Sequence, residues 1–219
     1  MSIVHSLDPV VLVGGADLAP HDLNIPQTTL ATYVAVDGGA DHLLAHGITP
    51  KAVIGDLDSI SADARTAFAE ILHQISEQDT VDFEKALLRV TAPLIYAVGF
   101  AGGRLDHTLA VLHVMGRHPN IPVILLSADD ASAIVPPDGL TLDLPIDTRV
   151  SLMPLADARL DGTGLKWPII DQAMHPMRFT SPSNAVATNP VQIRAMGPVV
   201  VTVPRAQVAA LAKAVFRAL

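Results

Sequence analysis

The chain has 219 residues, of which 50% are hydrophobic and 16% charged, so it can bury one large core or two small ones and is not a disordered protein. Its formal net charge of −8 at pH 7, with no run of Lys or Arg, argues against nucleic-acid binding through a basic face. The absence of cysteine excludes disulfides, thiolate catalysis and cysteine-ligated zinc.

The amino-terminal 15 residues do not resemble a targeting segment. They lack a basic region, and their short apolar stretch ends at Gly14-Gly15. The longest apolar runs of the chain have the length of a strand, far below the roughly 20 residues of a membrane span. We therefore expect a cytoplasmic protein with no membrane segment.

The first 128 residues alternate short apolar runs with helical patterns. The apolar runs predict strands at 10–13, 33–36, 52–54, 94–98 and 121–126. Apolar residues at helical spacing predict helices at 40–46, 61–72, 81–90 and 107–115. This alternation is typical of an α/β domain with a mostly parallel sheet and helices on both faces, which we assign to residues 1–130.

Beyond residue 131 the pattern changes, because prolines and glycines separate short segments without helical spacing. Strands are predicted at 140–144, 149–152, 178–180, 191–195 and 199–203, which indicates a smaller antiparallel β domain over residues 137–219. A boundary is expected near Pro136-Pro137. The chain then ends in an amphipathic helix behind Pro204, with Val208, Leu211, Val215 and Leu219 among its apolar residues.

Four acidic motifs follow apolar runs in the first half of the chain: Val-Asp-Gly-Gly at 36–39, Gly-Asp-Leu-Asp-Ser at 55–59, Gln-Asp-Thr-Val-Asp at 78–82 and Gly-Gly-Arg-Leu-Asp-His at 102–107. Carboxylates gathered at one edge of a sheet repel each other, by about 4 kcal/mol for a contacting pair at an effective dielectric near 20. A hard cation with oxygen ligands relieves this repulsion. The motifs therefore predict a Mg²⁺ site that handles a phosphorylated substrate.

Asp56 and Asp58 form the most informative pair of carboxylates. They are two residues apart in a turn just past a predicted strand, so both can reach one ion, directly or through water. The alternative is an Asx turn followed by a helix N-cap, for which one aspartate suffices.

Asp79 and Asp82 come at the start of a predicted helix, where acids also favour the helix dipole and cap free N–H groups. Lys85 is three residues beyond Asp82, on the same side of that helix. A metal-binding carboxylate and a phosphate-binding ammonium would then face one site, and Gln78 and Thr80 add polar groups beside it.

Arg104 can make a bidentate contact with phosphate. It follows a Gly-Gly pair whose backbone can approach an anion closely. Asp106 is equally suited to capping the following helix. Asp37 and Gly38 also fit a plain turn. Neither a P-loop nor a dinucleotide-binding glycine fingerprint is present, so the sequence supports neither a P-loop kinase nor a Rossmann dehydrogenase.

Together the four motifs, in this order and spacing, resemble thiamine pyrophosphokinase. A weaker likeness continues at Gly164-Leu-Lys-Trp-Pro168 and Ser181-Pro-Ser-Asn184. The resemblance implies an α/β domain that binds ATP and Mg²⁺, a carboxy-terminal β-sandwich that binds thiamine, and a homodimer with active sites at its interface. It also implies the reaction of ATP with thiamine to give AMP and thiamine diphosphate.

The resemblance further implies roles for individual residues. The metal would be held by Asp56, Asp58 and Asp82. ATP and its phosphates would meet Asp37, Gly38, Gln78, Asp79, Thr80, Lys85, Arg104 and Asp106, and thiamine would meet Ser181, Ser183 and Asn184. An unligated aspartate, Asp79 or Asp106, could accept the hydroxyl proton. The chain departs from the family in having Val81 where threonine is usual and no aromatic residue at 185–187.

Two other functions stay open at this point. The segment 53–59 superficially matches haloacid-dehalogenase-like phosphatases, in which Asp56 would be a covalent nucleophile and Asp129-Asp130 a later acidic motif. That alternative leaves the motifs at 78–85 and 102–107 unexplained. A non-catalytic protein that senses a nucleotide or thiamine would carry the same binding residues.

Overall fold

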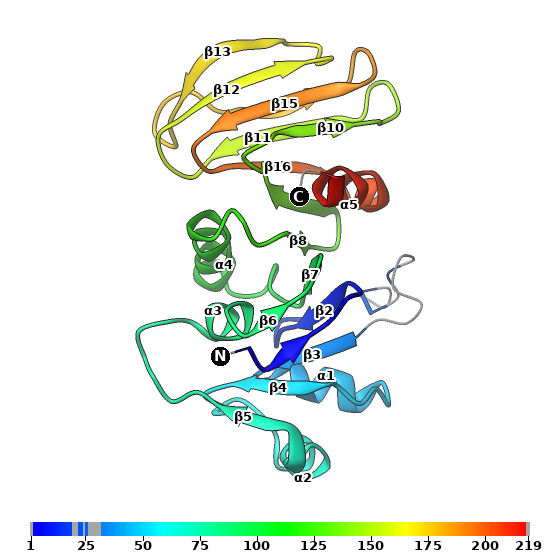
Figure 1. Cartoon of the computed structure of the whole chain (residues 1–219), viewed down its shortest axis with the longest axis vertical. Helices are drawn as coiled ribbons and strands as arrows, with labels where there is room; N and C mark the ends of the chain where they lie inside the picture. The colour runs from blue at the N-terminus through cyan, green and yellow to red at the C-terminus, as the bar shows by residue number, and fades with distance from the viewer. Residues whose placement is uncertain (1, 19–21, 24, 26–31, 218–219) are drawn as a thin grey trace. The chain divides into compact units, whose positions relative to one another are not determined.

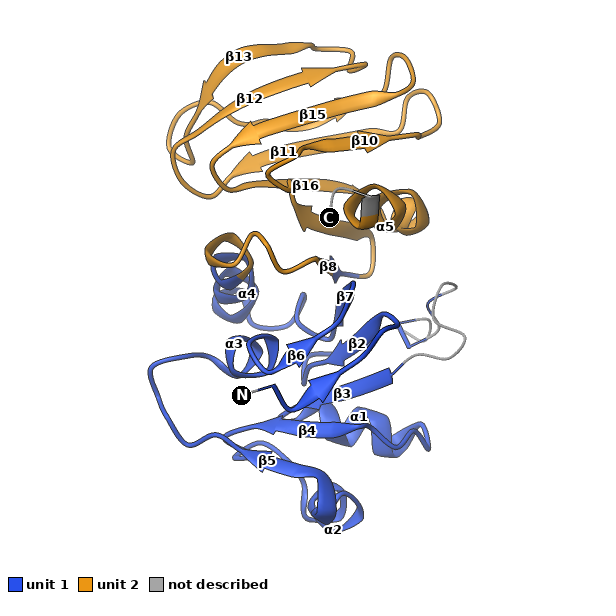
Figure 2. Ribbon diagram, viewed as in Figure 1, with its two compact units in different colours: residues 1–114, 125–127 blue, residues 115–124, 128–219 orange. Residues whose placement is uncertain are grey.

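The computed structural model describes residues 2–18, 22–23, 25 and 32–217. The chain divides into two compact units (Figure 2). The first comprises residues 1–114 and 125–127, and the second residues 115–124 and 128–219. The labels of the helices and strands can be followed in Figure 1.

Among the described residues of the first unit, the strands of the main parallel sheet pair in the order β7-β2-β3-β4-β5. Their bounds are β2 (Val10–Val13), β3 (Thr32–Val36), β4 (Ala52–Gly55), β5 (Leu72–Gln74) and β7 (Ile95–Val98). Every residue of β2, β4 and β7 is buried, as expected of parallel strands covered on both faces. A separate short parallel pair joins β1 (Val4–His5) to β6 (Val90–Thr91).

Helices connect these strands: α1 (Gly39–Ala45), α2 (Ala62–Ala67), the 3₁₀ helix η1 (Ala69–Ile71), α3 (Asp82–Leu87) and α4 (Leu105–Arg117). The connection from β3 through α1 to β4 advances across the sheet, whereas the one from β5 through α3 to β7 returns past β2. Because crossovers between parallel strands are right-handed, these opposite directions put α1 and α3 on opposite faces of the sheet. Both helices pack against β3.

The second unit contains two antiparallel sheets, with strand orders β14-β11-β16-β9 and β10-β15-β12-β13. Their bounds are β9 (Asp130–Ile134), β10 (Leu140–Leu142), β11 (Arg149–Pro154), β12 (Ala158–Thr163), β13 (Ile169–Met174), β14 (Ser181–Ala185), β15 (Val191–Met196) and β16 (Val199–Pro204). Strand β8 (Val123–Leu126) spans the division between the units. The unit ends with the 3₁₀ helix η2 (Arg205–Gln207) and α5 (Val208–Arg217), whose Leu211 and Val215 are buried.

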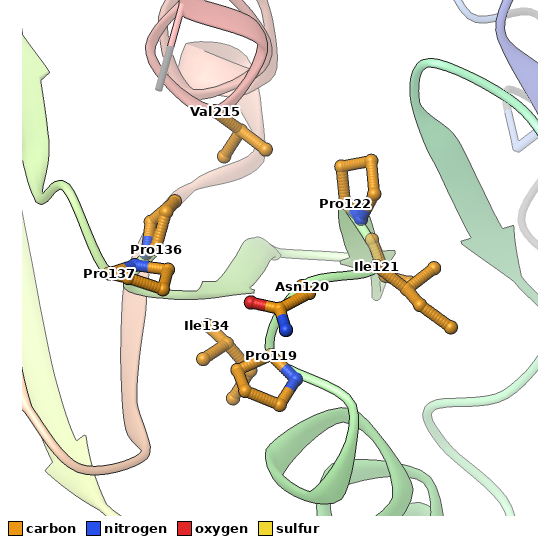
Figure 3. A pocket seen from close by; sticks show the side chains of 9 residues that line it. Pro119, Asn120, Ile121, Pro122, Ile134, Pro136, Pro137 and Val215 are labelled. Carbon is orange, nitrogen blue, oxygen red and sulfur yellow. The ribbon is translucent and has the colours of Figure 1, made fainter. Parts of the chain in front are cut away.

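A hollow in the second unit is lined by proline, isoleucine and valine side chains and one asparagine (Figure 3). The labelled side chains around it are Pro119, Asn120, Ile121, Pro122, Ile134, Pro136, Pro137 and Val215. None of its lining residues is titratable, so its chemistry is limited to apolar contact and the Asn120 amide.

Among the described helices, none has the length and apolar character needed to cross a membrane.

The predicted mixed α/β class is confirmed, but several elements differ from expectation. The helix expected at 61–72 ends at Ala67, because Leu72–Gln74 pairs with β4 as the strand β5. The strand expected at 178–180 lies instead at Ser181–Ala185. Pro204 ends β16 rather than opening the last helix, and Leu219 lies outside the described residues.

Candidate functional site

Four aspartates of the first unit lie at the carboxyl ends of β3 and β4 and at the start of α3. Asp37 follows β3, Asp56 and Asp58 follow β4, and Asp82 is the first residue of α3. Carboxyl ends of parallel strands meet at one edge of a sheet. Gly55 permits the approach, because a Cβ there would lie 3.1 Å from Asp37 Cβ and 3.3 Å from Asp82 Oδ1.

Three of these side chains form one oxygen cluster. One carboxylate oxygen each of Asp37, Asp56 and Asp58 lies within 4.8 Å of the other two. We call these three residues the carboxylate cluster. Asp37 is only 9% exposed, and its Oδ1 atom has no hydrogen-bond partner among the described residues. Because a buried carboxylate oxygen is costly without a partner, the cluster suits a hard cation that accepts oxygen ligands.

The pKa of Asp37 also reflects the burial of its carboxylate. Burial raises the pKa of Asp37, a hydrogen bond with Ser59 opposes the rise, and the negative charge of Asp82 adds to it. The protonated form of Asp37 is therefore favoured relative to an ordinary aspartate until positive charge arrives nearby.

The backbone of both loops that carry the carboxylate cluster is unusual. Asp37 has φ 46° and Leu57, between Asp56 and Asp58, has φ 66°. For a leucine this left-handed conformation costs roughly 1–2 kcal/mol, which the burial of Leu57 (3% exposed) offsets. Such strain is characteristic of residues held in place by their surroundings at functional sites.

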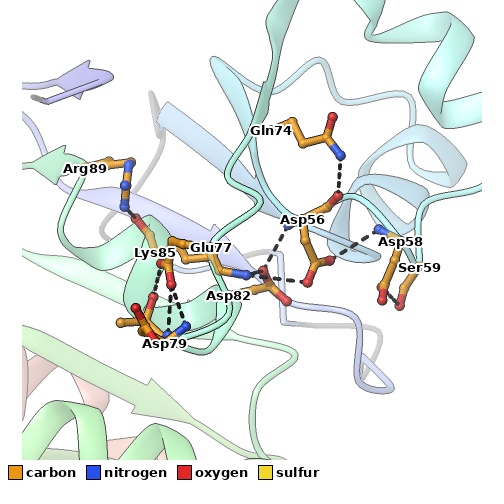
Figure 4. A network of polar contacts seen from close by, with 10 residues as sticks. Asp56, Asp58, Ser59, Gln74, Glu77, Asp79, Asp82, Lys85 and Arg89 are labelled. Carbon is orange, nitrogen blue, oxygen red and sulfur yellow. Dashed lines mark hydrogen bonds and ion pairs between the residues drawn. The ribbon is translucent and has the colours of Figure 1, made fainter.

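The turn after β4 combines features of both interpretations given above. The Asp58 N–H donates to Asp56 Oδ1 at 3.3 Å, which is the Asx-type contact, and the Ser59 hydroxyl donates to Asp58 Oδ1 at 2.8 Å (Figure 4). The N-cap of α2 is Ser61, which accepts from the Ala64 N–H. Neither aspartate caps the helix, so local structure accounts for only part of the motif.

Asp82 and Lys85 form a second group, which contacts Asp56 (Figure 4). Asp82 Oδ1 accepts from the Asp56 N–H at 3.0 Å and from Lys85 Nζ at 3.0 Å, and Lys85 Nζ also donates to Asp56 Oδ2 at 3.4 Å. Lys85 is only 1% exposed. Burial lowers its pKa, but the hydrogen bonds and charges of Asp82 and Asp56 outweigh this, and the net pKa is raised.

Asp82 therefore has a structural partner in addition to its predicted ligand role. It lies outside the carboxylate cluster as defined by mutual oxygen distances. The helix-capping alternative does not describe it either, since the N-cap of α3 is Val81, with no side-chain cap. The metal contact of Asp82 and the phosphate contact of Lys85 stay predictions.

The turn at residues 77–80 is organised by Glu77, which the sequence analysis did not single out. Its carboxylate accepts from the N–H groups of Asp79 (2.8 Å) and Thr80 (3.0 Å) and from the Thr80 hydroxyl. The Thr80 hydrogen bond is the main cause of a lowered pKa at Glu77. Gln78 and Asp79 are exposed, so their side chains face solvent from a shaped turn. Glutamate is not among the residues that usually accept from free backbone N–H groups at a turn or helix start, so the sequence carries no signal that points to Glu77.

Arg104 and Asp106 are each other's partners. The guanidinium donates through Nε at 3.2 Å and through a terminal nitrogen at 2.6 Å to the two carboxylate oxygens. The mutual hydrogen bonds raise the pKa of Arg104 and lower that of Asp106. Both side chains are well exposed, so the pair remains open to exchange partners with an anion.

The three residues that the sequence predicts to contact thiamine lie on β14 of the second unit. Ser181 is partly exposed and Ser183 is exposed with φ 59°, but Asn184 is only 2% exposed. The Asn184 side chain accepts from the N–H groups of Trp167 (3.2 Å) and Ala185 (2.9 Å) and donates to the Trp167 carbonyl at 2.8 Å. It therefore fixes the segment that carries Trp167, whose side chain is 62% exposed.

The Asn184→Ala substitution is expected to lower the free energy of unfolding by about 2 kcal/mol or more, because it leaves three backbone groups without partners. Urea denaturation followed by circular dichroism measures this loss. The neighbouring Ser183→Ala, at an exposed hydroxyl, is the control and should change the value by less than about 0.5 kcal/mol. Equal effects of the two substitutions would contradict the assigned role of Asn184.

The chain is similar to known proteins in both sequence and structure. The family described as "Thiamin pyrophosphokinase, catalytic domain" matches residues 28–125. Thiamine pyrophosphokinase of Bacillus subtilis (strain 168) is 30% identical over 172 residues, covering 73% of this chain and 80% of the relative. Thiamine pyrophosphokinase 1 of Oryza sativa subsp. japonica is 29% identical over 164 residues, covering 66% of this chain and 62% of the relative. The chain thus spans less than two thirds of the length of this plant relative.

The fold gives a parallel result. The crystal structure of thiamin pyrophosphokinase from Geobacillus thermodenitrificans superposes with a TM-score of 0.75 at 25% sequence identity, covering 90% of this chain and 96% of that structure. The agreement extends over both compact units, well beyond the acidic motifs. On the strength of the Bacillus subtilis relative and this shared fold, the chain belongs to the thiamine pyrophosphokinase family.

Proposed function

We propose that the protein transfers the diphosphate group of ATP to the hydroxyl of thiamine, giving AMP and thiamine diphosphate. The observation that carries the proposal is the carboxylate cluster with its unsatisfied, buried Asp37 oxygen, in a chain of this family. Diphosphoryl transfer asks little covalent chemistry of the protein, and depends on positioning and on neutralising charge.

The cluster residues fit Mg²⁺, which prefers carboxylate oxygens. Asp37, Asp56 and Asp58 would hold the ion, with Asp82 as a further predicted ligand beside Asp56. When bound, Mg²⁺ would neutralise charge on the phosphate oxygens of the nucleotide. The aspartates would place the ion at the carboxyl ends of β3 and β4. The strained turns at Asp37 and Leu57 hold the aspartate side chains in place.

The remaining predicted residues would complete the site. Gly38, Gln78, Thr80 and Arg104 would contact ATP, with Arg104 leaving Asp106 for a phosphate oxygen. Asp79, exposed on its turn, or Asp106, once released, would accept the proton of the attacking hydroxyl.

We further propose an assignment of the two domains and an assembly. Residues 1–130 would bind ATP and Mg²⁺, and residues 137–219 would form a β-sandwich that binds thiamine through Ser181, Ser183 and the segment fixed by Asn184. Two copies would form a homodimer with active sites at its interface, and the enzyme would work in the cytoplasm.

Product identity tests the proposed reaction. Protein mixed with Mg²⁺, ATP and thiamine is expected to release AMP and thiamine diphosphate in equal amounts, measured by chromatography. Omitting thiamine, or adding EDTA, should stop both products. ADP as the product would instead indicate an ordinary kinase.

The same assay separates the two alternatives. A phosphatase would release inorganic phosphate from simple esters without nucleotide, and a sensor would bind its ligands without turnover. The second acidic motif of the phosphatase alternative is already engaged elsewhere, since Asp130 forms an ion pair with Arg149 within the second unit. The relatives named above likewise favour the transferase.

A further inference from the structure

A buried ammonium group lies against the carboxylates of the site. Lys85 is on α3, the helix that packs against β4, and its side chain is 2% exposed. Its Nζ atom is 3.0 Å from Asp82 Oδ1 and 3.4 Å from Asp56 Oδ2. A lysine this deeply buried is rare unless it is paired, and here both partners are aspartates at the candidate metal site (Figure 4).

The ammonium and a divalent cation would share one carboxylate. Asp56 Oδ2 accepts from Lys85, while Asp56 is also one of the three residues whose oxygens lie within 4.8 Å of one another. A second observation points to a ligand at this cluster, since the Asp37 Oδ1 atom is buried and has no partner in the part of the chain that the structure describes. Lys85 therefore satisfies Asp56 and Asp82 and leaves Asp37 unsatisfied.

We propose that Lys85 is the built-in counter-ion of the carboxylate cluster. It positions Asp56 and Asp82 when no metal is bound, and it weakens the affinity of the cluster for a free divalent cation. The inference assigns Lys85 an indirect role in the site, and it rests on the proposed function for the identity of the physiological ion. Because Nζ is buried and held by two aspartates, its first effect is on these side chains rather than on the nucleotide.

A lysine that served only folding would have a different effect on metal affinity. If Lys85 served folding alone, its loss would lower stability and leave metal affinity unchanged or weaker. If it is a counter-ion, its loss removes a positive charge a few ångströms from the metal position, and cation affinity rises. Charges this close change binding by at least about tenfold at protein-like dielectric constants.

The test is Mn²⁺ binding to nucleotide-free protein, measured by isothermal titration calorimetry and by electron paramagnetic resonance of the free ion. The Lys85→Met protein is expected to bind Mn²⁺ at least about tenfold more tightly than the original chain. Its melting temperature should be lower in EDTA and should rise more on adding Mn²⁺, since at one ligand concentration a tighter-binding ligand stabilises the folded state more. Lys51→Met, at an exposed lysine of the same unit, is the matched control and should leave both values unchanged.

Unchanged or weaker Mn²⁺ binding in Lys85→Met would overturn the proposal. Should this variant not fold, Lys85→Gln carries the same prediction, because its amide can still donate to Asp82 without the charge. The experiment uses metal alone, so its outcome does not depend on turnover. A protein that fails to make AMP but shows the affinity gain would refute the proposed function and keep the role of Lys85.

Discussion

Turnover is expected to fall by more than about a hundredfold when Asp58 is replaced by asparagine, and equally when Asp56 is. Asparagine keeps the shape of each side chain and removes the negative charge that would hold the cation at the cluster. Losing only a group that supports a metal ligand typically costs 10–100-fold, so losing the ligand charge itself should cost more. Initial rates of AMP formation at saturating ATP and thiamine measure the effect.

The fold should survive both substitutions. Asp58 is exposed, and Lys85 keeps Asp82 as a partner at 3.0 Å when Asp56 is neutral. Circular dichroism and the melting temperature in EDTA should therefore stay close to those of the original chain. Asp63→Asn, at an exposed aspartate in the first turn of α2, is the control for a general loss of surface charge. Retained activity in both Asp56→Asn and Asp58→Asn would refute the metal assignment.

Replacing Gly39 by alanine is expected to destabilise the chain by about 3 kcal/mol or more. Gly39 is the first residue of α1, and a Cβ there would lie 1.8 Å from the carbonyl oxygen of Val13 at the end of β2. No rotamer relieves a clash between a Cβ and a backbone atom, so α1 must move away from the sheet. Inserted groups in packed regions typically cost 1–3 kcal/mol, and a backbone clash is at the upper end.

Gly38→Ala provides the comparison at the adjacent position. Its Cβ would make ordinary contacts at 3.5–3.7 Å, with the Ser59 carbonyl oxygen the nearest atom, and its φ of −54° suits alanine. Urea denaturation of the two variants should differ by at least about 2 kcal/mol in free energy of unfolding. Similar stabilities would show that α1 is less closely seated on β2 than the structure indicates.

Much of the first unit follows from local sequence. Continuous apolar runs predicted β2, β3, β4 and β7 within two residues at either end, because fully buried parallel strands need no polar alternation. The motifs at 36–39 and 55–59 directly follow two of these runs, so the approach of Asp37, Asp56 and Asp58 at one edge of the sheet was predictable as well. Ser61 was correctly expected to begin a helix, and its hydroxyl accepts from the Ala64 N–H.

The second unit was less predictable, and β12 and β13 show why. An antiparallel sheet with one solvated face carries polar residues on that face, and here Arg159 and Asp171 form an ion pair between the two strands. Charges and the glycine at 162 hide the alternation that would mark a strand. The pairing of β5 with β4 was missed for a related reason, since Leu72–Gln74 is short and half polar.

Within the site, sequence spacing indicated which residues converge but not which way each one faces. Lys85 and Asp82 were expected on one side of a helix, and they are, but burial of that side depends on how α3 packs against β4. The role of Glu77 depends on a turn whose shape no periodicity encodes. Asn184 was expected to contact thiamine because of its motif, whereas two of its four hydrogen bonds go to the backbone of Trp167, 17 residues away.

That last arrangement makes the protein a natural optical reporter. The chain has one tryptophan, and its ring is largely open to water while its backbone is pinned by a buried amide. Fluorescence excited at the indole band therefore originates from a single, mechanically anchored position. Any molecule that covers that ring alters the emission of an unlabelled, unmodified chain.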